Sequence, residues 1–290
     1  MLDFTGLTNS TRLNWPRPIW IKEAIMALTD KVVVITGAAR GMGEQYVRAF
    51  LKEGSKVVAL DVSWTGVEEF QQELSSYEEA ITLSGDISSD SDIDTVYQTA
   101  IDRFGTVDVL INNASVRMRD VDPSTVISIL DTNNDQWQRT FDVSLFGTIK
   151  VIRRFVQPML EAKSGSIINI FSSSGVQGRP GNQPYGAVKA ALNNMTQSLA
   201  GELKDYNIAV NSLMPGGTRS TGYDEQTRLQ QEMGRIRRQL PVRPDHTVPG
   251  ALFLAQQDAS SFTGESVDAL KWNEANGFGG YDAWVSPDQD

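Results

Sequence analysis

Short apolar runs rich in β-branched residues alternate with longer helical patterns from residue 31 onward. The first run, Lys31-Val-Val-Val-Ile-Thr36, is bounded by glycine and indicates a buried strand. Strands are expected at residues 31–36, 56–60, 80–83, 107–111, 166–171 and 208–213. Helices are expected at residues 44–53, 67–75, 90–104, 135–162 and 185–206.

The regular alternation of strand and helix predicts a parallel sheet, because parallel strands need helical crossovers. We therefore expect an α/β fold with a single doubly wound sheet of about seven strands and helices on both faces. Sheets of this kind bind ligands beyond the carboxyl ends of their strands. Functional side chains are accordingly expected directly after strands.

Both ends of the chain differ from this pattern. Residues 1–28 contain Trp15-Pro16-Arg17-Pro18, and prolines break regular structure, so an irregular extension is predicted there. Residues 29–269 form the expected dinucleotide-binding and catalytic domain. Residues 270–290 form a tail of aromatic and glycine residues, which we expect to pack on this subunit or a neighbour and to narrow the substrate pocket.

The composition excludes several kinds of site. The 290 residues contain no cysteine, which excludes disulfides, zinc–thiolate sites and iron–sulfur clusters. The one histidine, His246, excludes a multi-histidine metal site, so no metal is expected. It lies in a polar turn and is expected to cap the next helix without a catalytic role. The net charge of −10 argues against a nucleic-acid partner.

No segment approaches the roughly 18 consecutive apolar residues of a membrane span. The first residues also lack a basic region followed by an apolar run, as a secretory signal would require. We therefore expect no membrane partner and a cytoplasmic location.

A glycine-rich loop follows the first predicted strand directly. Its sequence is Thr36-Gly-Ala-Ala-Arg-Gly-Met-Gly43, with glycines at Gly37, Gly41 and Gly43 and a helix after it. Glycines let the backbone approach a pyrophosphate, and the helix N-terminus supplies free N–H groups and partial positive charge. The loop therefore predicts a dinucleotide site.

Two residues bear on which dinucleotide is used. Asp61 closes the second strand, where a carboxylate accepts both hydroxyls of an adenosine ribose and repels a 2′-phosphate. Arg40 acts in the opposite direction, because a guanidinium in the loop can bind that phosphate. We weight Asp61 more heavily and predict NAD, with NADP as the alternative. Asp86 and Ile87 are expected beside the adenine.

A tyrosine and a lysine four residues apart form the candidate acid–base pair. Tyr185 and Lys189 share one face of a predicted helix, and a neighbouring cation lowers the pKa of a phenol. Ser172 stands at the end of the fifth strand, where its hydroxyl can hold a substrate oxygen beside Tyr185. Ser173 and Ser174 are alternatives that depend on register.

Taken together, these motifs resemble the classical short-chain dehydrogenase/reductase family over residues 29 to 268. The family pattern T-G-x-x-x-G-x-G matches residues 36–43, and Y-x-x-x-K matches Tyr185 and Lys189. The N-N-A-G motif matches residues 112–115, with serine as the last residue. The P-G motif after the sixth strand matches Pro215-Gly216.

The resemblance implies a Rossmann-type fold and hydride transfer between a nicotinamide and a secondary alcohol or ketone. It implies that Tyr185 is the general acid/base, that Lys189 lowers its pKa and binds the nicotinamide ribose, and that Ser172 polarises the carbonyl. It also implies a homotetramer or homodimer. The cofactor-binding residues it implies are Gly37, Arg40, Gly41, Met42, Gly43, Asp61, Asp86, Ile87, Asn113, Ala114, Tyr185, Lys189, Pro215, Gly216, Thr218 and Ser220.

Several features depart from the family or leave alternatives open. Ser144 stands where the family has the asparagine that supports a water-linked proton relay, and the resemblance makes it a candidate catalytic residue at that place. Val267-Asp268 runs on where the family ends in V-D-G-G. A long connection at residues 116–134 is expected beside the site. The nearby arginines are compatible with an anionic substrate or with a solvated surface; they are Arg117, Arg119, Arg228, Arg235, Arg237 and Arg238. An NADPH-dependent carbonyl reductase and a nucleotide-binding sensor without turnover remain alternatives.

Overall fold

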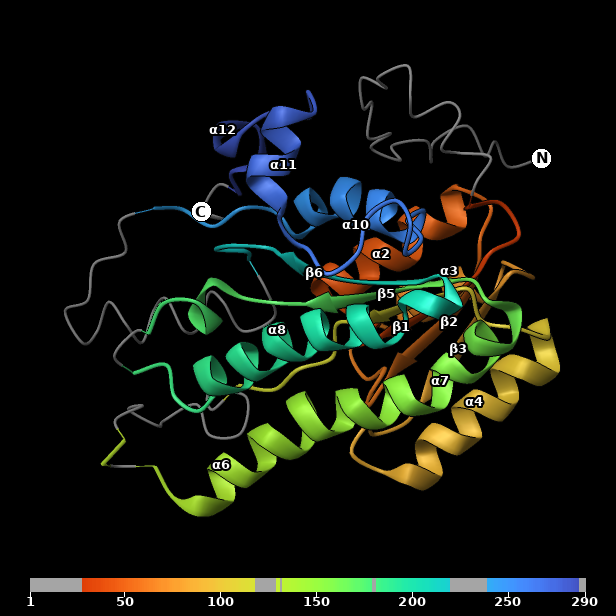
Figure 1. Ribbon diagram of the computed structural model, residues 1–290, viewed down its shortest axis with the longest axis horizontal. Coiled ribbons are helices and arrows are strands. Elements are labelled where there is room, and N and C mark those ends of the chain that lie inside the picture. The colour runs from red at the N-terminus through yellow and green to blue at the C-terminus, as the bar shows by residue number, and fades with distance from the viewer. Residues whose placement is uncertain (1–27, 118–128, 131, 179–180, 220–238, 287–290) are drawn as a thin grey trace, which may run out of the picture.

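The computed structural model describes residues 28–117, 129–130, 132–178, 181–219 and 239–286. Within these ranges, seven strands form one parallel sheet in the order β3-β2-β1-β4-β5-β6-β7 (Figure 1). The strands are β1 (Val32–Thr36), β2 (Lys56–Asp61), β3 (Ala80–Ser84), β4 (Val109–Asn112), β5 (Gly165–Ile170), β6 (Ile208–Met214) and β7 (Ser266–Asp268). The predicted doubly wound α/β sheet is confirmed.

Helices cover both faces of this sheet (Figure 1). One face carries α2 (Gly41–Lys52), α3 (Glu68–Leu74) and α10 (Val248–Ala255). The other face carries α4 (Asp90–Phe104), α7 (Thr148–Ala162) and α8 (Tyr185–Glu202). The strand order reverses direction between β1 and β4, which opens a crevice at the carboxyl ends of these strands.

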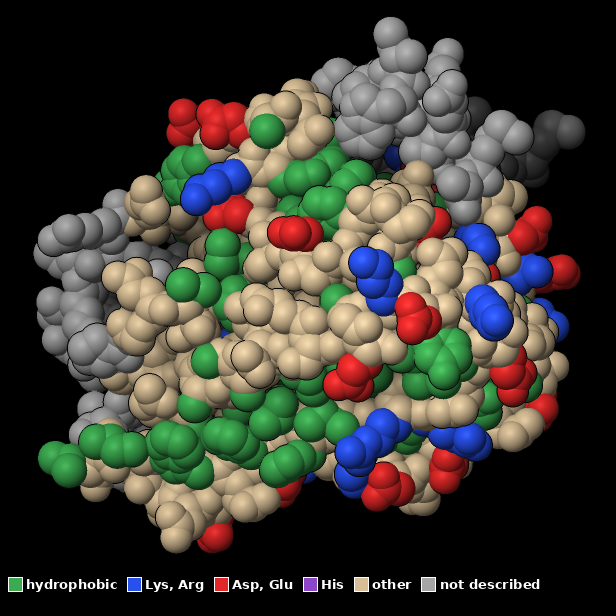
Figure 2. Space-filling model, in the orientation of Figure 1, with side chains coloured by type: hydrophobic (Ala, Val, Ile, Leu, Met, Phe, Trp, Pro, Cys, Tyr) green, Lys and Arg blue, Asp and Glu red, His purple; other side chains and the backbone are tan. Residues whose placement is uncertain are grey.

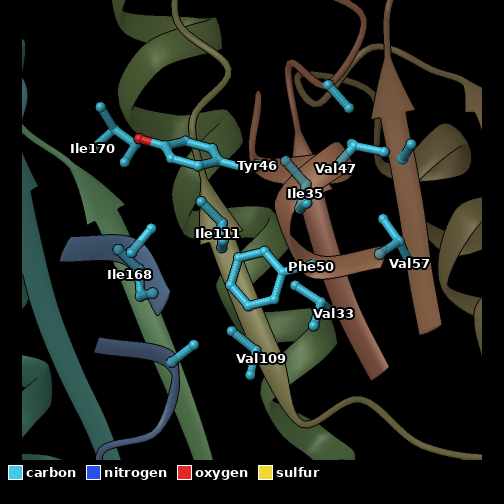
Figure 3. Close-up of a cluster of buried hydrophobic side chains, with 14 of the residues drawn as sticks. Val33, Ile35, Tyr46, Val47, Phe50, Val57, Val109, Ile111, Ile168 and Ile170 are labelled. Carbon is cyan, nitrogen blue, oxygen red and sulfur yellow. The ribbon is translucent and has the colours of Figure 1, made fainter. Parts of the chain in front are cut away.

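The face under α2 shows how the sequence fixes this packing. Tyr46 and Phe50 lie one turn apart on α2, and both side chains are fully buried. Figure 3 shows them inserted among the β-branched side chains of the strands, including Ile35 of β1 and Ile111 of β4. Burying large aromatic groups in this way anchors the helix that follows the glycine loop. The loop is thereby held at the crevice.

The prediction of one uniform helix at residues 135–162 is wrong in one respect, because a π-helical turn interrupts the α-helix. Helix α6 (Asn134–Phe141) passes into a wide π-helical turn at Asp142–Gly147 before α7 begins. Gly147 packs so closely on Ile87 that a Cβ there would lie 2.9 Å from the Ile87 carbonyl oxygen. The wide turn therefore brings this part of the helix against the loop after β3.

The aromatic tail contains two helices, α11 (Ala269–Ala275) and α12 (Tyr281–Trp284). Asp268 ends β7 and caps α11, because its carboxylate accepts hydrogen bonds from the N–H groups of Leu270 and Lys271. This explains how the chain leaves the sheet where the family motif is altered. Trp284 is buried within the domain, so the tail packs on its own subunit.

None of the described helices combines the length and the apolar character that crossing a membrane requires.

Candidate active site

A cavity of about 580 Å³ lies at the carboxyl ends of the parallel strands. Its walls include residues that directly follow β1, β2, β3, β4, β5 and β6, together with residues of α6, the π-helical turn and α8. All but three of the site residues predicted from the sequence line it. The exceptions are Gly43 and Ser144, which are buried beside the cavity, and Ser220, which lies outside the described residues.

The glycine loop is joined to the segment after β4 by hydrogen bonds. The Asn113 amide donates to the carbonyl oxygens of Thr36 and Gly37, at 3.1 and 2.8 Å. Gly37 has a φ of +65°, and a Cβ there would lie 2.9 Å from the Ala114 Cα. Only glycine allows this approach. The first turn of α2 then opens on the cavity, with no side-chain cap on its N–H groups.

These features fit a dinucleotide with its pyrophosphate over the loop. Arg40 is the N-cap residue of α2 and Gly41 its first residue, and both line the cavity together with Met42. Free N–H groups at a helix N-terminus are donors that suit phosphate oxygens. The backbone therefore provides the cradle that the sequence motif predicts.

Asp61 lies at the end of β2, held by two backbone donors. Its carboxylate accepts hydrogen bonds from the N–H of Ala39 at 2.9 Å and the N–H of Ser63 at 3.2 Å. The Arg40 guanidinium donates to the carbonyl oxygens of Ser63 and Thr65 in the same loop. Arg40 thus binds the backbone beside Asp61, and the Asp61 carboxylate lines the cavity wall.

Asp86 has a charged partner that the sequence did not predict. Arg139 of α6 lies 3.1 Å from the Asp86 carboxylate and lines the same cavity. Although burial opposes the charged form, hydrogen bonds from Ser88 and the charge of Arg139 keep the pKa of Asp86 below its usual value. No sequence motif links α6 to the loop after β3, so only the fold shows this pair.

Tyr185 and Lys189 lie on the cavity side of α8. The Lys189 Nζ is 5.5 Å from the centroid of the Tyr185 ring and donates to the Ile170 carbonyl oxygen at 2.8 Å. Burial alone would raise the pKa of the phenol, but Lys189, Arg117 and the Ser172 hydroxyl together hold the pKa of Tyr185 below its usual value. Burial also lowers the pKa of Lys189.

The structure distinguishes between the three candidate serines. Ser172 lines the cavity together with Tyr185, and its hydroxyl helps to lower the pKa of Tyr185. Ser173 and Ser174 instead form a short 3₁₀ turn, and neither is among the described residues that line the cavity. The Ser172 Oγ also accepts a hydrogen bond from the N–H of Ser174 at 3.2 Å, which fixes its position at the start of this turn.

Ser144 lies in the π-helical turn and is fully buried. Its hydroxyl accepts hydrogen bonds from the N–H of Val116 at 2.9 Å and the Ser115 hydroxyl at 3.1 Å, and it donates to the Val116 carbonyl oxygen at 3.3 Å. These contacts tie the helix to the segment after β4.

Arg117 is the one arginine of the six near-site candidates that falls among the described residues. It lines the cavity, with its guanidinium carbon 5.2 Å from the centroid of the Tyr185 ring. The sequence did not separate it from its neighbours, because the contact joins two segments far apart in the chain. Arg119, Arg228, Arg235, Arg237 and Arg238 lie outside the described residues.

His246 does not act as the predicted helix cap. It is fully buried, and its ring nitrogens lie near backbone carbonyl oxygens instead of the N–H groups of α10. Nε2 is 2.6 Å from the Pro215 oxygen and Nδ1 is 2.5 Å from the Arg243 oxygen. His246 therefore braces the loop after β6, of which Pro215, Gly216 and Thr218 line the cavity.

Comparison with known proteins places this site in a family. Residues 31–232 match the short chain dehydrogenase family. Fluoren-9-ol dehydrogenase of Terrabacter sp. is 40% identical over 269 residues, covering 89% of this chain and 75% of that protein. The 3-alpha-(or 20-beta)-hydroxysteroid dehydrogenase of Mycobacterium tuberculosis is 35% identical over 239 residues, covering 82% of this chain and 86% of that protein.

A solved structure agrees with these matches. The 3-ketoacyl-(acyl-carrier-protein) reductase from Brucella melitensis, complexed with NADH, superposes with a TM-score of 0.72 at 28% identity. The match covers 83% of this chain and 97% of that one. The sheet order, the glycine loop, the Tyr185–Lys189 pair and these relatives agree: the chain is an oxidoreductase of the classical short-chain dehydrogenase/reductase family.

Proposed function

We propose that this protein is an NAD-dependent dehydrogenase that transfers hydride between the nicotinamide and a secondary alcohol or ketone. The proposal rests on one observation. A single cavity is lined by Ser172, Tyr185 and Lys189 and, at another part of its wall, by Asp61. When bound, the nicotinamide accepts or supplies the hydride. The protein supplies orientation and the proton.

In this proposal Tyr185 carries the proton. Alcohol oxidation needs the phenolate as a base, and ketone reduction needs the phenol as an acid. The lowered pKa of Tyr185 brings its two forms closer in energy at neutral pH. Ser172 holds the substrate oxygen next to the phenol, and Lys189 keeps a positive charge beside it.

NAD is proposed over NADP because of the charge at Asp61. A 2′-phosphate beside this carboxylate would bring two negative groups together. Arg40, the one described cation of the glycine loop, donates to the Ser63 and Thr65 carbonyl oxygens. A 2′-phosphate would have to compete with these carbonyls for the Arg40 guanidinium.

The proposed substrate is a ring-fused secondary alcohol. Two relatives are named for fluoren-9-ol and for hydroxysteroids, both of which are alcohols that contain a fused ring system. The cavity wall that includes Tyr185 also includes Val116, Val143 and Phe171, which offer apolar contacts to such rings.

The test is a panel of ring-fused and open-chain secondary alcohols with NAD and with NADP, followed by NADH absorbance. Fluoren-9-ol with NAD is expected to turn over, and fluoren-9-one with NADH is expected to be reduced. Tyr185→Phe is expected to lower kcat by about 10²- to 10⁴-fold while NADH still binds. NADH binding without turnover of any substrate in wild type would favour the sensor alternative, and turnover with NADPH only would overturn the cofactor assignment.

We also propose that the protein forms a homodimer or homotetramer. Figure 2 shows hydrophobic side chains gathered along α6 and the adjoining part of α7, at the lower left of the view. Ile129, Leu130 and Phe146 are exposed hydrophobic residues in or next to these elements. Apolar surface of this kind is typical of interfaces. Light scattering in solution is expected to give a mass of at least twice 31.9 kDa, and a monomer would refute the proposal.

A further inference from the structure

Tyr185 has two cationic neighbours, one more than the Tyr–Lys motif provides. The Lys189 Nζ lies 5.5 Å from its ring centroid and the Arg117 guanidinium carbon lies 5.2 Å from it. The two cations come from different elements, since Lys189 belongs to α8 and Arg117 to the segment after β4.

The fold holds Arg117 at this place through the residues that precede it. Asn113 is bonded to the glycine loop, and Val116 is bonded through both its N–H and its carbonyl group to the buried Ser144 hydroxyl. The backbone is thus fixed on two sides up to the residue before Arg117. Because the backbone before Arg117 is already ordered, its guanidinium loses less conformational entropy when it contacts the Tyr185 ring.

We propose that Arg117 is a second cation of the acid–base site, which acts with Lys189 to stabilise the Tyr185 phenolate. This inference rests on the proposed role of Tyr185 in proton transfer. In alcohol oxidation the carbinol C–H bond breaks and its electron pair leaves as hydride to the nicotinamide. The O–H bond breaks, its proton passes to the phenolate oxygen, and the carbon–oxygen bond becomes a carbonyl.

Charge around the phenol explains why a second cation matters. Among the described residues, the charged groups that act on Tyr185 are Lys189 from its own helix and Arg117 from the segment after β4, with the neutral Ser172 hydroxyl after β5. Arg117 also lowers the pKa of Lys189, because the two cations repel each other. Ionisation of Tyr185 relieves this repulsion, so both effects favour the phenolate.

The first test measures ionisation without turnover. The phenolate absorbance of the full chain is titrated with pH, and subtraction of the Tyr185→Phe curve isolates Tyr185 from the other six tyrosines. Arg117→Met is expected to move this midpoint up by about one pH unit, and Arg117→Lys is expected to restore most of the shift. An unchanged midpoint in Arg117→Met would overturn the proposal.

A matched control uses an arginine that stacks on a different tyrosine. The Arg154 guanidinium carbon lies 3.9 Å from the centroid of the Tyr97 ring, between α7 and α4 on the far side of the sheet from α2. Arg154→Met is expected to leave the Tyr185 midpoint unchanged. Circular dichroism and thermal unfolding of each variant show whether a shift comes from loss of structure.

The second test uses fluoren-9-ol oxidation and fluoren-9-one reduction over a range of pH. Oxidation needs the phenolate, so its rate rises as pH rises through the pKa, and Arg117→Met is expected to move this rise to higher pH. Reduction needs the phenol, so the rate of reduction falls as pH rises through the pKa. Arg117→Met is expected to move this fall to higher pH as well. At a fixed pH below both midpoints, oxidation is expected to fall about tenfold while reduction keeps its rate.

The two tests separate this inference from the proposed function. If no substrate turns over, the titration still decides whether Arg117 acts on Tyr185. If Arg117 instead bound an anionic substrate group, Arg117→Met would raise KM and leave the phenolate midpoint in the free protein where it was. That result would refute the proposal.

Discussion

At the scale of single residues, the Asp61 carboxylate is bonded to the backbone of the loop and is the group on which the proposed choice of NAD rests. Asp61 accepts hydrogen bonds from the N–H groups of Ala39 and Ser63, so its orientation is fixed before any nucleotide binds. Preorganised acceptors bind ribose hydroxyls with little loss of freedom. The same fixed charge cannot turn away from a 2′-phosphate.

Asp61→Asn is therefore expected to reduce the preference for NAD. Loss of a charged hydrogen bond weakens binding by about 1.5–3 kcal/mol, which is about 10- to 100-fold in the Kd for NADH. The Kd for NADPH is expected to fall, because the repulsion is removed while Arg40 remains. Fluorescence titration of both nucleotides measures the ratio.

Asp90→Asn serves as the control for this change. Asp90 is an exposed carboxylate paired with Lys150 at the start of α4, away from the cavity. Asp90→Asn removes one negative charge from the protein, as Asp61→Asn does, but leaves the glycine loop unchanged. Equal changes in the NADH to NADPH ratio for Asp61→Asn and Asp90→Asn would show that overall charge, and not Asp61, sets the preference.

At the scale of elements, the closest packing occurs where the glycine loop meets α2. Gly43 lies in the first turn of α2, and a Cβ there would overlap the carbonyl oxygen of Gly37. The overlap is with backbone, so no side-chain rotation relieves it. The loop and the helix can therefore take these positions only with glycine at residue 43.

Gly43→Ala is expected to destabilise the fold by about 1–3 kcal/mol and to weaken NADH binding, since the loop must move. Gly201→Ala is the matched substitution in α8, where the glycine is exposed and an added Cβ meets nothing within 4 Å. It is expected to stabilise the protein by about 0.5–1 kcal/mol, because alanine is the better helix former. Urea unfolding measures both changes. A stable Gly43→Ala variant with normal NADH affinity would contradict the packing interpretation.

The sequence predicted those elements whose signals are local. The β-branched runs between glycines gave the strands of the sheet, and the strand–glycine–helix order located the nucleotide loop. The π-helical turn at Asp142–Gly147 was not predicted, since one extra residue in a turn barely alters the apolar period, and its packing on Ile87 joins segments far apart in the chain. Arg117 at Tyr185 and Arg139 at Asp86 were missed for the same reason, because each pair forms only when distant segments meet.

At the scale of the whole molecule, the tail reaches the cavity only indirectly. None of the described tail residues lines the cavity, so no described contact of the tail narrows the pocket as the sequence analysis expected. Instead Trp284 packs on His246, with ring centroids 6.3 Å apart, and its carbonyl oxygen accepts from the N–H of Arg243 at 2.8 Å. His246 in turn contacts the Pro215 carbonyl oxygen. The tail thus supports the loop after β6 through His246.

Trp284→Ala is expected to lower stability by about 3–5 kcal/mol, because it empties a buried aromatic site, and also to weaken NADH binding. The second effect follows because His246 and the loop at Pro215 lose their support.

Trp272→Ala is the matched control within the tail, because Trp272 packs on Phe253 and Phe278 instead of on His246. It is expected to cost stability while leaving the NADH Kd of the folded protein unchanged. Calorimetry measures the stability of each variant, and NADH fluorescence measures the Kd at a temperature where each variant is folded. An equal loss of NADH affinity in both variants would mean that the tail acts through general stability and not through His246.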